Sequence, residues 1–413
     1  MSQPISETIA LRPGFERLLF GVLLASTIGD EITQVALVFR VAPAGSGPQI
    51  AALLIALLLP GALVAPYAGK LVDHHDAAKI LAATSLAQAF VSGVIAFTGG
   101  VTAALTGAAM LSFLFAFSGA ATFTLVPIVG RAAGLSVARV NAATEFASGS
   151  GSVFGPLAGG LLVASGGTAV ALLFDAASFL LLGLVIVLSH LSRPGAPDAD
   201  NPGWTPVAVF RGYAPIARQR RIMLLLASFW VVIMALAIAD GVYVFLVTNV
   251  LSRGPFAYGA FIAVWAGAYL ISAWAAGGYV ERNARWTALV GLGSIAASFL
   301  AIGLTGALAP SLPLAVVAMA FLIGGAGNAI YNVSARTILH TTVRPELHGR
   351  AAALYAAGTR ISEGSGSAIG GLLGQASVLI AYILSGVVAL AAAGGCRTCR
   401  RRRSGWPICL ASV

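Results

Sequence analysis

The sequence predicts an all-α integral membrane protein with twelve transmembrane helices in two related six-helix halves. Three observations support this fold class: an unusually apolar composition, long apolar tracts along the whole chain, and short motifs that occur twice. Of the 413 residues, 58% are hydrophobic and only 9% are charged, and the mean hydropathy is +0.92. Soluble globular domains carry about 25% charged residues. We therefore expect lipid to surround most of this chain.

The apolar tracts are long enough to be membrane-spanning helices. Crossing about 30 Å of hydrocarbon takes about 20 mainly apolar residues in a helix. Twelve such tracts are predicted, at 15–40, 49–71, 79–98, 103–127, 140–164, 168–190, 222–249, 257–280, 286–308, 312–335, 351–374 and 376–395. The first tract is full-length, carries Asp30 and Glu31 and lacks a small-residue cleavage site. We expect it to remain in the protein and not to be removed as a signal peptide.

Basic residues lie almost entirely on one side of the predicted membrane. If both termini are cytoplasmic, only Arg40 and Arg253 fall in loops on the opposite face. Cytoplasmic loops are the ones enriched in Lys and Arg, so we expect a multi-pass protein of the cell (cytoplasmic) membrane with both termini in the cytoplasm. The formal net charge of +10 then reflects this topology and attraction to anionic lipid headgroups. We expect no nucleic-acid partner.

One long polar segment divides the chain near its middle. Residues 192–221 are rich in Pro, Gly and charge, and we expect a cytoplasmic linker there. It separates an N-terminal six-helix half, 1–191, from a C-terminal half, 222–395. The remaining residues, 396–413, form a basic cytoplasmic tail that we expect to bind anionic headgroups. Its single C-x2-C pair supplies only half a zinc site, so we expect no metal and no cofactor.

Two motifs occur once in each predicted half. The segment "GKLVDHHDAAK" contains Gly69 and Asp73, and "GGYVERNAR" contains Gly277 and Glu281 at an offset of 208 residues. The phrase "TEFASGSGSVFG" recurs as "TRISEGSGSAIG" at an offset of 215 residues. Repetition at a nearly constant offset indicates a duplicated, parallel six-helix unit.

These motifs resemble those of the major facilitator superfamily. The first is similar to its loop motif G-x-L-x-D-R, with His74 in place of the usual arginine and Asp76 where glycine is common. The segment "GSVFGPLAGG" is similar to the end of the G-x3-G-P-x2-G-G signature associated with antiporters of that superfamily. The segments "GDEITQVAL", "DAASFLL" and "RPELHGR" resemble its twelve-span drug, macrolide and siderophore exporters. The resemblance implies alternating access, in which two halves rock around a central site, as is known for this superfamily.

The loop motif implies a conformational switch. A carboxylate at the cytoplasmic end of a helix can bind the positive N-terminus of a neighbouring helix or a loop arginine in one conformation and release it in the other. The alternative, that these residues are merely solvated, stays open. The switch residues are Gly69, Asp73 and His74 in the first copy and Gly277, Glu281 and Arg282 in the second.

The repeated small residues predict close helix packing. Helices in lipid lack a hydrophobic force that drives them together, and small residues let their backbones approach. A proline removes one backbone hydrogen bond and permits a bend. We expect both copies of the phrase to pack closely, and slide, against the opposite half. The residues of this helix-packing motif in the first copy are Gly151, Gly155, Pro156, Gly159 and Gly160.

Charges inside the predicted spans are the strongest functional signal, because each costs about 2.5–3.5 kcal/mol near the bilayer centre. A buried carboxylate can avoid this cost by taking a proton, which makes it a natural proton carrier. Arg360 stays charged, and its spacing from Glu363 places both on one side of a helix. Two interpretations stay open: a local ion pair, or an Arg360 that acts on another carboxylate or on an anionic substrate group. The carboxylates are Asp30, Glu31, Glu145, Asp175, Asp240 and Glu363.

The resemblance also implies which of these groups face a central cavity. In the superfamily, spans 1, 4, 7 and 10 line it. On that basis we expect a proton-coupling and cavity set of Asp30, Glu31, Gln34, Asp240, Tyr243, Asn328, Asn332, Arg360 and Glu363. We expect Asp175 instead to pack against a neighbouring polar group, and Glu145 to be a wetted acid at a helix end.

Taken with the resemblance, the sequence predicts a secondary active transporter and not an enzyme. The predicted activity is proton-coupled efflux, as an antiporter, of a small amphipathic organic compound such as a drug or natural product, with a role in drug resistance. No G-x4-G-K-[ST] loop occurs, so we expect an ion gradient and not ATP as the energy source. The expected partners are the substrate, protons and membrane lipids, and the chain is expected to be a monomer. Alternatives are a proton-coupled uptake carrier on the same fold, an integral membrane enzyme, a lipid scramblase or a non-transporting sensor.

Overall fold

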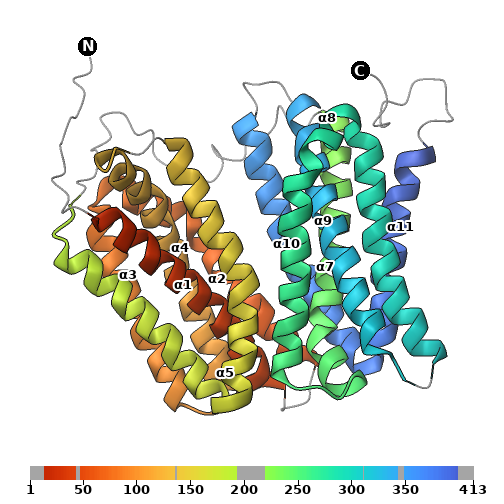
Figure 1. The fold of residues 1–413 in the computed structure, drawn as a ribbon, viewed down its shortest axis with the longest axis horizontal. Coiled ribbons are helices and arrows are strands. Elements are labelled where there is room, and N and C mark those ends of the chain that lie inside the picture. Colours follow the sequence, from red (N-terminus) through yellow and green to blue (C-terminus); the bar gives the residue numbers. More distant parts are fainter. Residues whose placement is uncertain are drawn as a thin grey trace. The chain divides into compact units, whose positions relative to one another are not determined.

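The computed structural model describes residues 14–42, 47–134, 137–192, 219–309, 311–342 and 348–398. Every regular element in these ranges is a helix, and no strand occurs among them (Figure 1). The prediction of an all-α protein is therefore confirmed for the part of the chain that the structure describes.

The helices follow the predicted apolar tracts in order. The first group comprises α1 (Phe15–Val41), α2 (Gly47–His74), α3 (Ala77–Phe97), α4 (Val101–Ala132) and α5 (Val137–Leu188). The second comprises α7 (Arg220–Phe245), the π-helical turn η2 (Leu246–Val250), α8 (Pro255–Leu308), α9 (Leu314–Thr342), α10 (His348–Ala376) and α11 (Val378–Thr398). Both α4 and α9 run past their predicted spans, to Ala132 and Thr342.

Two of these helices each contain two predicted spans. α5 turns at Gly167, whose φ of 78° and ψ of 174° suit glycine because it has no Cβ. α8 turns at Asn283, with φ −159° and ψ 76°. The Asn283 Oδ1 accepts a hydrogen bond from the Trp286 N–H at 3.1 Å, in the manner of a residue that caps the start of a helix. All twelve predicted spans are thus helical.

Nine helical segments among the described residues are long and apolar enough to cross a membrane. The two limbs of α5 count once among them, as Gly149–Leu188, and Val378–Ala392 of α11 is a shorter apolar helix. α10 is absent from this set, and it is rich in glycine and serine and carries Arg360 and Glu363. These lengths and compositions are those of a multi-pass membrane protein.

The chain forms two compact units. The first comprises Met1–Arg40 and Ala56–Ala199, and the second comprises Val41–Ile55 and Asp200–Val413. The first turns of α2 therefore group with the second unit. Gly371 of α10 accounts for this, because a Cβ there would lie 2.7 Å from the Ala51 Cβ.

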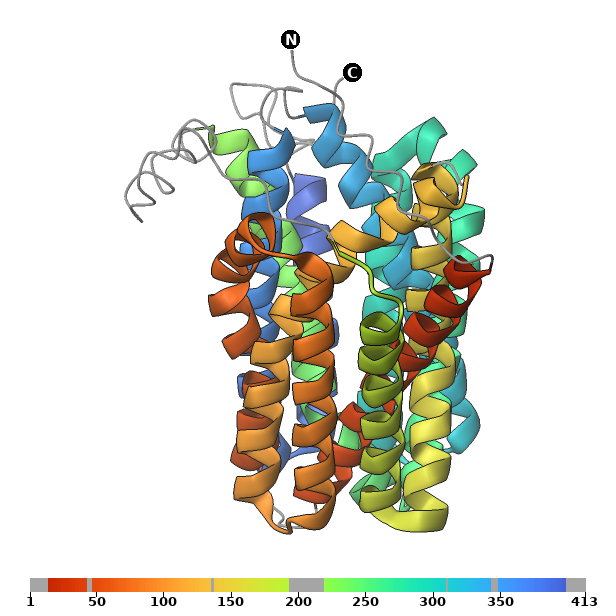
Figure 2. The ribbon, with the colours of Figure 1, turned by 90° about the vertical axis from the view of Figure 1, so that its left-hand side faces the viewer.

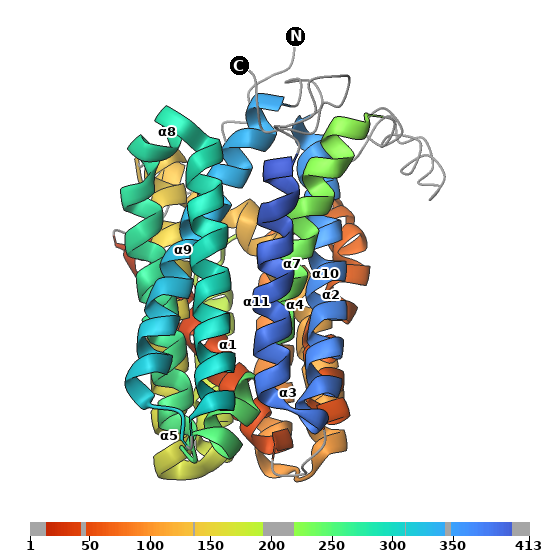
Figure 3. The same cartoon turned by 90° about the vertical axis from the view of Figure 1, so that its right-hand side faces the viewer.

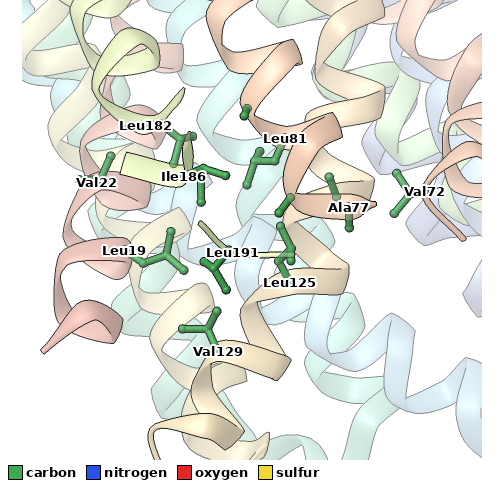
Figure 4. Packing of buried hydrophobic residues seen from close by; sticks show 13 residues of the cluster. Leu19, Val22, Val72, Ala77, Leu81, Leu125, Val129, Leu182, Ile186 and Leu191 are labelled. Carbon is green, nitrogen blue, oxygen red and sulfur yellow. The ribbon is translucent and has the colours of Figure 1, made fainter. Parts of the chain in front are cut away.

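Aliphatic side chains fill one end of the first unit. α3 lies beside α4 and α5 (Figure 2), and Leu19 of α1, Leu81 of α3, Leu125 of α4 and Leu182 of α5 meet in one buried cluster (Figure 4). The start of α3 is fixed by Asp76, whose Oδ1 accepts from the Ala78 N–H at 2.9 Å and whose Oδ2 accepts from the Ser192 hydroxyl at 2.6 Å. The residue where glycine is common in the loop motif is thus a helix cap.

Aromatic rings fill the interior of the second unit. There, α8 packs against α9, and α7 packs against α10 and α11 (Figure 3). The ring centroids of Tyr243 and Tyr258 are 4.4 Å apart, and those of Tyr243 and Phe321 are 5.2 Å apart. Trp265 and Phe299 stack at 6.1 Å, and Phe299 meets Tyr382 edge-on at 5.8 Å. The two units therefore share a helical plan but differ in what fills them.

Glycines hold α5 against α1 in the first unit. A Cβ at Gly151 would lie 2.5 Å from Thr27 Cγ2, one at Gly155 would lie 2.4 Å from Glu31 Cβ, and one at Gly159 would lie 3.0 Å from Ile32 Cα. Real Cβ atoms essentially never come closer than 3.0 Å to a heavy atom. The two backbones can therefore approach as they do only because Gly151 and Gly155 lack side chains, and a Cβ at Gly159 would be tighter than nine in ten real contacts.

The second unit repeats this contact between α10 and α7. A Cβ at Gly366 would lie 2.6 Å from the Met234 carbonyl oxygen, and one at Gly370 would lie 2.3 Å from that of Ile238. In both copies the glycines contact a helix of their own unit. The expectation that they pack against the opposite half is therefore wrong for these residues, because the repeated phrase closes each unit on itself.

The glycine contact predicts a position-specific effect on stability. We expect Gly155→Leu to lower the free energy of unfolding by about 1–3 kcal/mol, because the added side chain must displace Glu31 and the backbone of α1. Thermal unfolding of the purified protein in detergent measures this change. The matched control is Gly93→Ala in α3, where a Cβ would meet nothing within 4 Å and where alanine gains about 0.5–1 kcal/mol over glycine in a helix. Equal loss of stability in both variants would contradict the packing role.

Candidate functional site

The first unit contains a buried carboxylate that is bonded to three hydroxyl groups. Asp175 of α5 is 0% exposed. Its Oδ2 accepts hydrogen bonds from Thr33 Oγ1 of α1 at 2.6 Å and from Ser92 Oγ of α3 at 3.1 Å. Its Oδ1 lies 3.4 Å from the hydroxyl of Ser178 on its own helix. The prediction that Asp175 packs against neighbouring polar groups is confirmed.

Asp175 lies directly against the backbone of α1, beside Asp30. A Cβ at Gly29 would lie 2.5 Å from Asp175 Oδ1 and 2.6 Å from Ser178 Oγ. The missing side chain at Gly29 is what admits the carboxylate. Asp30 is the next residue along, is half-buried, and interacts electrostatically with Asp175. Two carboxyl groups from α1 and α5 thus lie close together inside the first unit.

The other polar residues of α1 differ in their surroundings. Glu31 is half-buried, and its Oε1 accepts a hydrogen bond from Ser152 Oγ of α5 at 3.3 Å. Gln34 is exposed. The predicted cavity residues of this helix therefore divide into two partly buried acids and one exposed amide.

Arg40, at the end of α1, ties three helices together. Its Nη1 donates to the carbonyl oxygens of Ile95 and, at 3.1 Å, Thr98, at the end of α3. Its Nε and Nη2 donate to Thr168 Oγ1 at 3.1 and 3.0 Å, just after the turn in α5. A cation at a helix C-terminus is favourable, because the carbonyl groups there are unpaired and partly negative. Sequence reasoning identified Arg40 as an exception to the charge pattern, but it did not assign this role.

The second unit places Asp240 on an otherwise buried stretch of α7. Its neighbours Ala239 and Gly241 are buried, whereas Asp240 itself is exposed. It interacts electrostatically with Glu363 of α10. Arg360 Nη1 donates to Glu363 Oε2 at 3.2 Å, and these two side chains are 59% and 36% exposed. The local ion pair exists, and it leaves much of the guanidinium accessible.

Three other predicted cavity residues are engaged in local contacts. Tyr243 is buried, and its hydroxyl donates to the Tyr258 carbonyl oxygen at 2.6 Å, so it belongs to the aromatic interior. Asn332 Nδ2 donates to Asn328 Oδ1 at 2.7 Å and to the Asn328 carbonyl oxygen at 2.9 Å. Both asparagines are half-buried on α9. The Asn328 and Asn332 amides thus form one polar group on that helix.

The motif residues are only partly described. Gly160 and Pro156 are buried within α5, Glu281 and Arg282 are exposed, and a Cβ at Gly69 would meet nothing within 4 Å. The side chains of Asp73, His74 and Glu145 and the surroundings of Gly277 lie outside what the structure describes, as do residues 193–218 of the linker and 399–413 of the tail. Among the described residues, no group of three or more His, Cys, Asp or Glu is placed to hold a metal ion.

The glycine contacts show that Asp30 and Asp240 are equivalent. The Ile28 carbonyl oxygen faces Gly155, and the Ile238 carbonyl oxygen faces Gly370. These pairs relate α1 to α7 by 210 residues and α5 to α10 by 215 residues. The 210-residue offset carries Asp30 onto Asp240. Each unit therefore presents one carboxylate at the same point of the helix that its glycines hold.

Helical units of this kind, with polar groups set into apolar spans, are those of a multi-pass membrane protein. The family model of the Major Facilitator Superfamily matches residues 15–305. The chain belongs to this superfamily, which points to a transporter and not to an enzyme. No curated protein matches the chain in sequence.

Solved structures share the fold along nearly the whole chain. The nucleoside transporter NupG is 14% identical, with a TM-score of 0.71 over 92% of this chain and 97% of its own. A bacterial homologue of the iron transporter ferroportin, in an inward-facing state, is 16% identical, with a TM-score of 0.70 over 92% and 98%. A POT family transporter in complex with a thioalcohol-conjugated peptide is 14% identical, with a TM-score of 0.67 over 94% and 98%. At these identities the likeness concerns the fold alone.

The hydrogen bonds of Arg40 predict a structural role. We expect Arg40→Met to lower the free energy of unfolding by about 1.5–3 kcal/mol, the usual worth of hydrogen bonds to a charged group. Thermal unfolding in detergent measures this loss. Arg253→Met serves as the control, because Arg253 is exposed and exposed substitutions usually change stability by no more than about 0.5 kcal/mol. Indistinguishable melting curves for the two variants would refute the role.

The exposed ion pair of Arg360 and Glu363 predicts, in contrast to Arg40, little effect on stability. We expect Arg360→Met to change the free energy of unfolding by less than about 1 kcal/mol, because exposed ion pairs contribute little. Comparison with Glu363→Gln and with the double variant isolates the energy of the pair. A loss much larger than this would show that Arg360 holds a structural partner besides Glu363.

Proposed function

We propose that this transporter couples proton entry to the export of a small amphipathic organic compound, such as a drug or natural product. The observation that carries the proposal is the equivalence of Asp30 and Asp240. Two carboxylates at matching points of α1 and α7 are costly in lipid unless each exchanges protons or binds a cationic group. A protonated carboxyl group binds a cationic group of the substrate weakly, and a deprotonated carboxylate binds it well. Alternating protonation of these carboxylates therefore links proton entry to substrate export.

The remaining residues have supporting roles in this proposal. Glu31 and Gln34 extend the polar surface of α1, and Asn328 and Asn332 offer amide groups from α9. Arg360, which is paired with Glu363 but 59% exposed, supplies a positive charge that competes for Asp240 or for an anionic part of the substrate. The two halves rock in alternating access, and the loops around Asp73 and Glu281 form and break contacts between the two states. The chain acts as a monomer in the cell membrane, with both termini in the cytoplasm.

Export is favoured over uptake by one sequence feature. The segment from Gly151 to Gly160 is similar to the signature of antiporters, and the structure uses three of its glycines to hold α5 on α1. Proton-coupled uptake on the same fold is the second candidate, since structures with this fold include nucleoside and peptide transporters. The substrate class rests on the subgroup motifs, because the shared fold serves nucleosides, iron and peptides alike.

Transport in inverted membrane vesicles tests the proposal. We expect an imposed pH gradient, acidic inside, to drive accumulation of at least one compound of a panel of fluorescent lipophilic cations. We expect Asp30→Asn and Asp240→Asn each to reduce that accumulation at least about tenfold, which corresponds to about 1.4 kcal/mol. Glu16→Gln, at the start of α1, is the matched control and retains transport.

The other candidate functions give different results in the same assay. Accumulation driven only by the opposite gradient, acidic outside, would favour proton-coupled uptake. Movement of labelled lipid without any gradient would favour a scramblase. Failure of both carboxylate variants to alter proton-driven flux would reject these two residues as the coupling groups.

A further inference from the structure

Matching glycine contacts allow the interiors of the two units to be compared residue by residue. A Cβ at Gly183 of α5 would lie 2.9 Å from Leu86 Cγ and 3.4 Å from the Ala82 carbonyl oxygen. A Cβ at Gly386 of α11 would meet Leu300 Cγ at 2.6 Å and the Ala296 carbonyl oxygen at 3.1 Å. The contacts match atom for atom. They relate α3 to the second limb of α8 by 214 residues, and the second limb of α5 to α11 by 203 residues.

These offsets identify what occupies the place of Asp175 in the second unit. Asp175 corresponds to Val378, which is buried. Of its two hydrogen-bond donors on other helices, Ser92 corresponds to Gly306, and Thr33 corresponds to Tyr243. The second unit therefore closes the same helix junction with a valine, a glycine and an aromatic ring. This architecture does not require a carboxylate there.

The polar interior continues along α3. Ser85 and Gln88 lie on the same face of the helix as Ser92, at spacings of seven and four residues, and are 0% and 1% exposed. Within the part of the chain that the structure describes, Ser85 Oγ and Gln88 Oε1 have no hydrogen-bond partner. Their equivalents in the second unit, Phe299 and Ile302, are apolar. A buried amide oxygen one turn from the hydroxyl that binds Asp175 thus lacks a donor, and such atoms usually bind an ordered water.

Burying a carboxylate and leaving polar atoms unpaired are both costly. A duplicated fold that dispenses with these groups in one copy keeps them in the other for a reason other than packing. We propose that Asp175 is a second protonation site of the first unit, which exchanges a proton with Asp30. In the exchange, the O–H bond at the Asp30 carboxyl group breaks, an O–H bond forms at Asp175, and the negative charge moves to Asp30. Ser92 and Gln88 continue the polar interior from this pair of carboxyl groups along α3.

The titratable groups that face Asp175 are few. On α1, Asp30 interacts electrostatically with Asp175, and Arg40 lies two turns beyond Thr33 and is bound to carbonyl groups at the end of α3. α3 carries no titratable residue between Ile80 and Phe97, and α4 carries none before Arg131. Asp30 thus interacts electrostatically with two carboxyl groups, Asp175 on α5 and Glu31 on its own helix. One unit can hold more than one exchangeable proton, which raises the number of protons available to each transport cycle.

Infrared titration of the purified protein in detergent tests this inference. The C=O stretching band of a protonated carboxyl group is followed from acid to alkaline pH in the wild type and in Asp175→Asn, Asp175→Val and Asp30→Asn. Among the bands that titrate in the wild type, we expect one to be absent from both Asp175 variants. We expect that band to remain in Asp30→Asn but to titrate at a different pH, because the two groups exchange a proton.

Two results would overturn the inference. A band from Asp175 that stays constant across the range, or no such band at any pH, would show a structural residue. A titration that depends on added NaCl or MnCl2 would show a cation site instead. Asp175→Val installs the residue of the second unit, and Ser92→Gly likewise removes one donor. If the Asp175 variants do not fold, the shift of the band in Ser92→Gly and Asp30→Asn still decides the question.

The inference rests on the proposed proton coupling, but its test involves no transport. An efflux assay that fails while the band titrates would reject the proposed export and keep the second site. A successful efflux assay without a titrating band from Asp175 would keep the proposed export and reject the second protonation site.

Discussion

Close approach of helix backbones is the constraint on which the rest of the structure depends. Lipid tails are as apolar as the side chains that face them, so a helix in a membrane gains little by exchanging lipid for a neighbouring helix. What holds the helices is contact at short distance and a few buried hydrogen bonds. Gly155 on Ile28 and Gly370 on Ile238 supply that contact in the two units. Because these glycines fix the rotation of α1 and α7, they also decide where Asp30 and Asp240 point.

A second constraint concerns polarity. Once α1 and α5 are in contact, a polar group between them must find a partner, and Gly29 makes room for Asp175 to meet Thr33. The second unit solves the same junction with Tyr243 and Val378. Identical backbone contacts thus support a polar interior in one unit and an aromatic interior in the other. The backbone contacts set the architecture, and the side chains inside each unit can differ and take on separate chemical roles.

Much of the fold could be predicted from the sequence because the relevant signals are local. Apolar tracts predict helices in lipid whatever surrounds them, and the turns at Gly167 and Asn283 fall where such tracts are interrupted. The site was less predictable, because its contacts join residues far apart. Arg40 binds Thr168 across 128 residues, and Thr33 binds Asp175 across 142. Tyr243 shows the same limit: its spacing from Asp240 says nothing of the carbonyl group that its hydroxyl binds. The partner helix of the repeated glycines was mistaken for the same reason.

The matching glycine contacts also limit how this gene can change. Inserting one residue into a helix turns everything beyond it by about 100°, since 3.6 residues make a turn. An insertion between Gly151 and Gly159 would rotate the later glycines away from α1 and bring side chains into the contact. Offsets of 210, 215 and 203 residues between the halves show that length has nevertheless changed. Those changes fall between the matched glycine contacts and not within them.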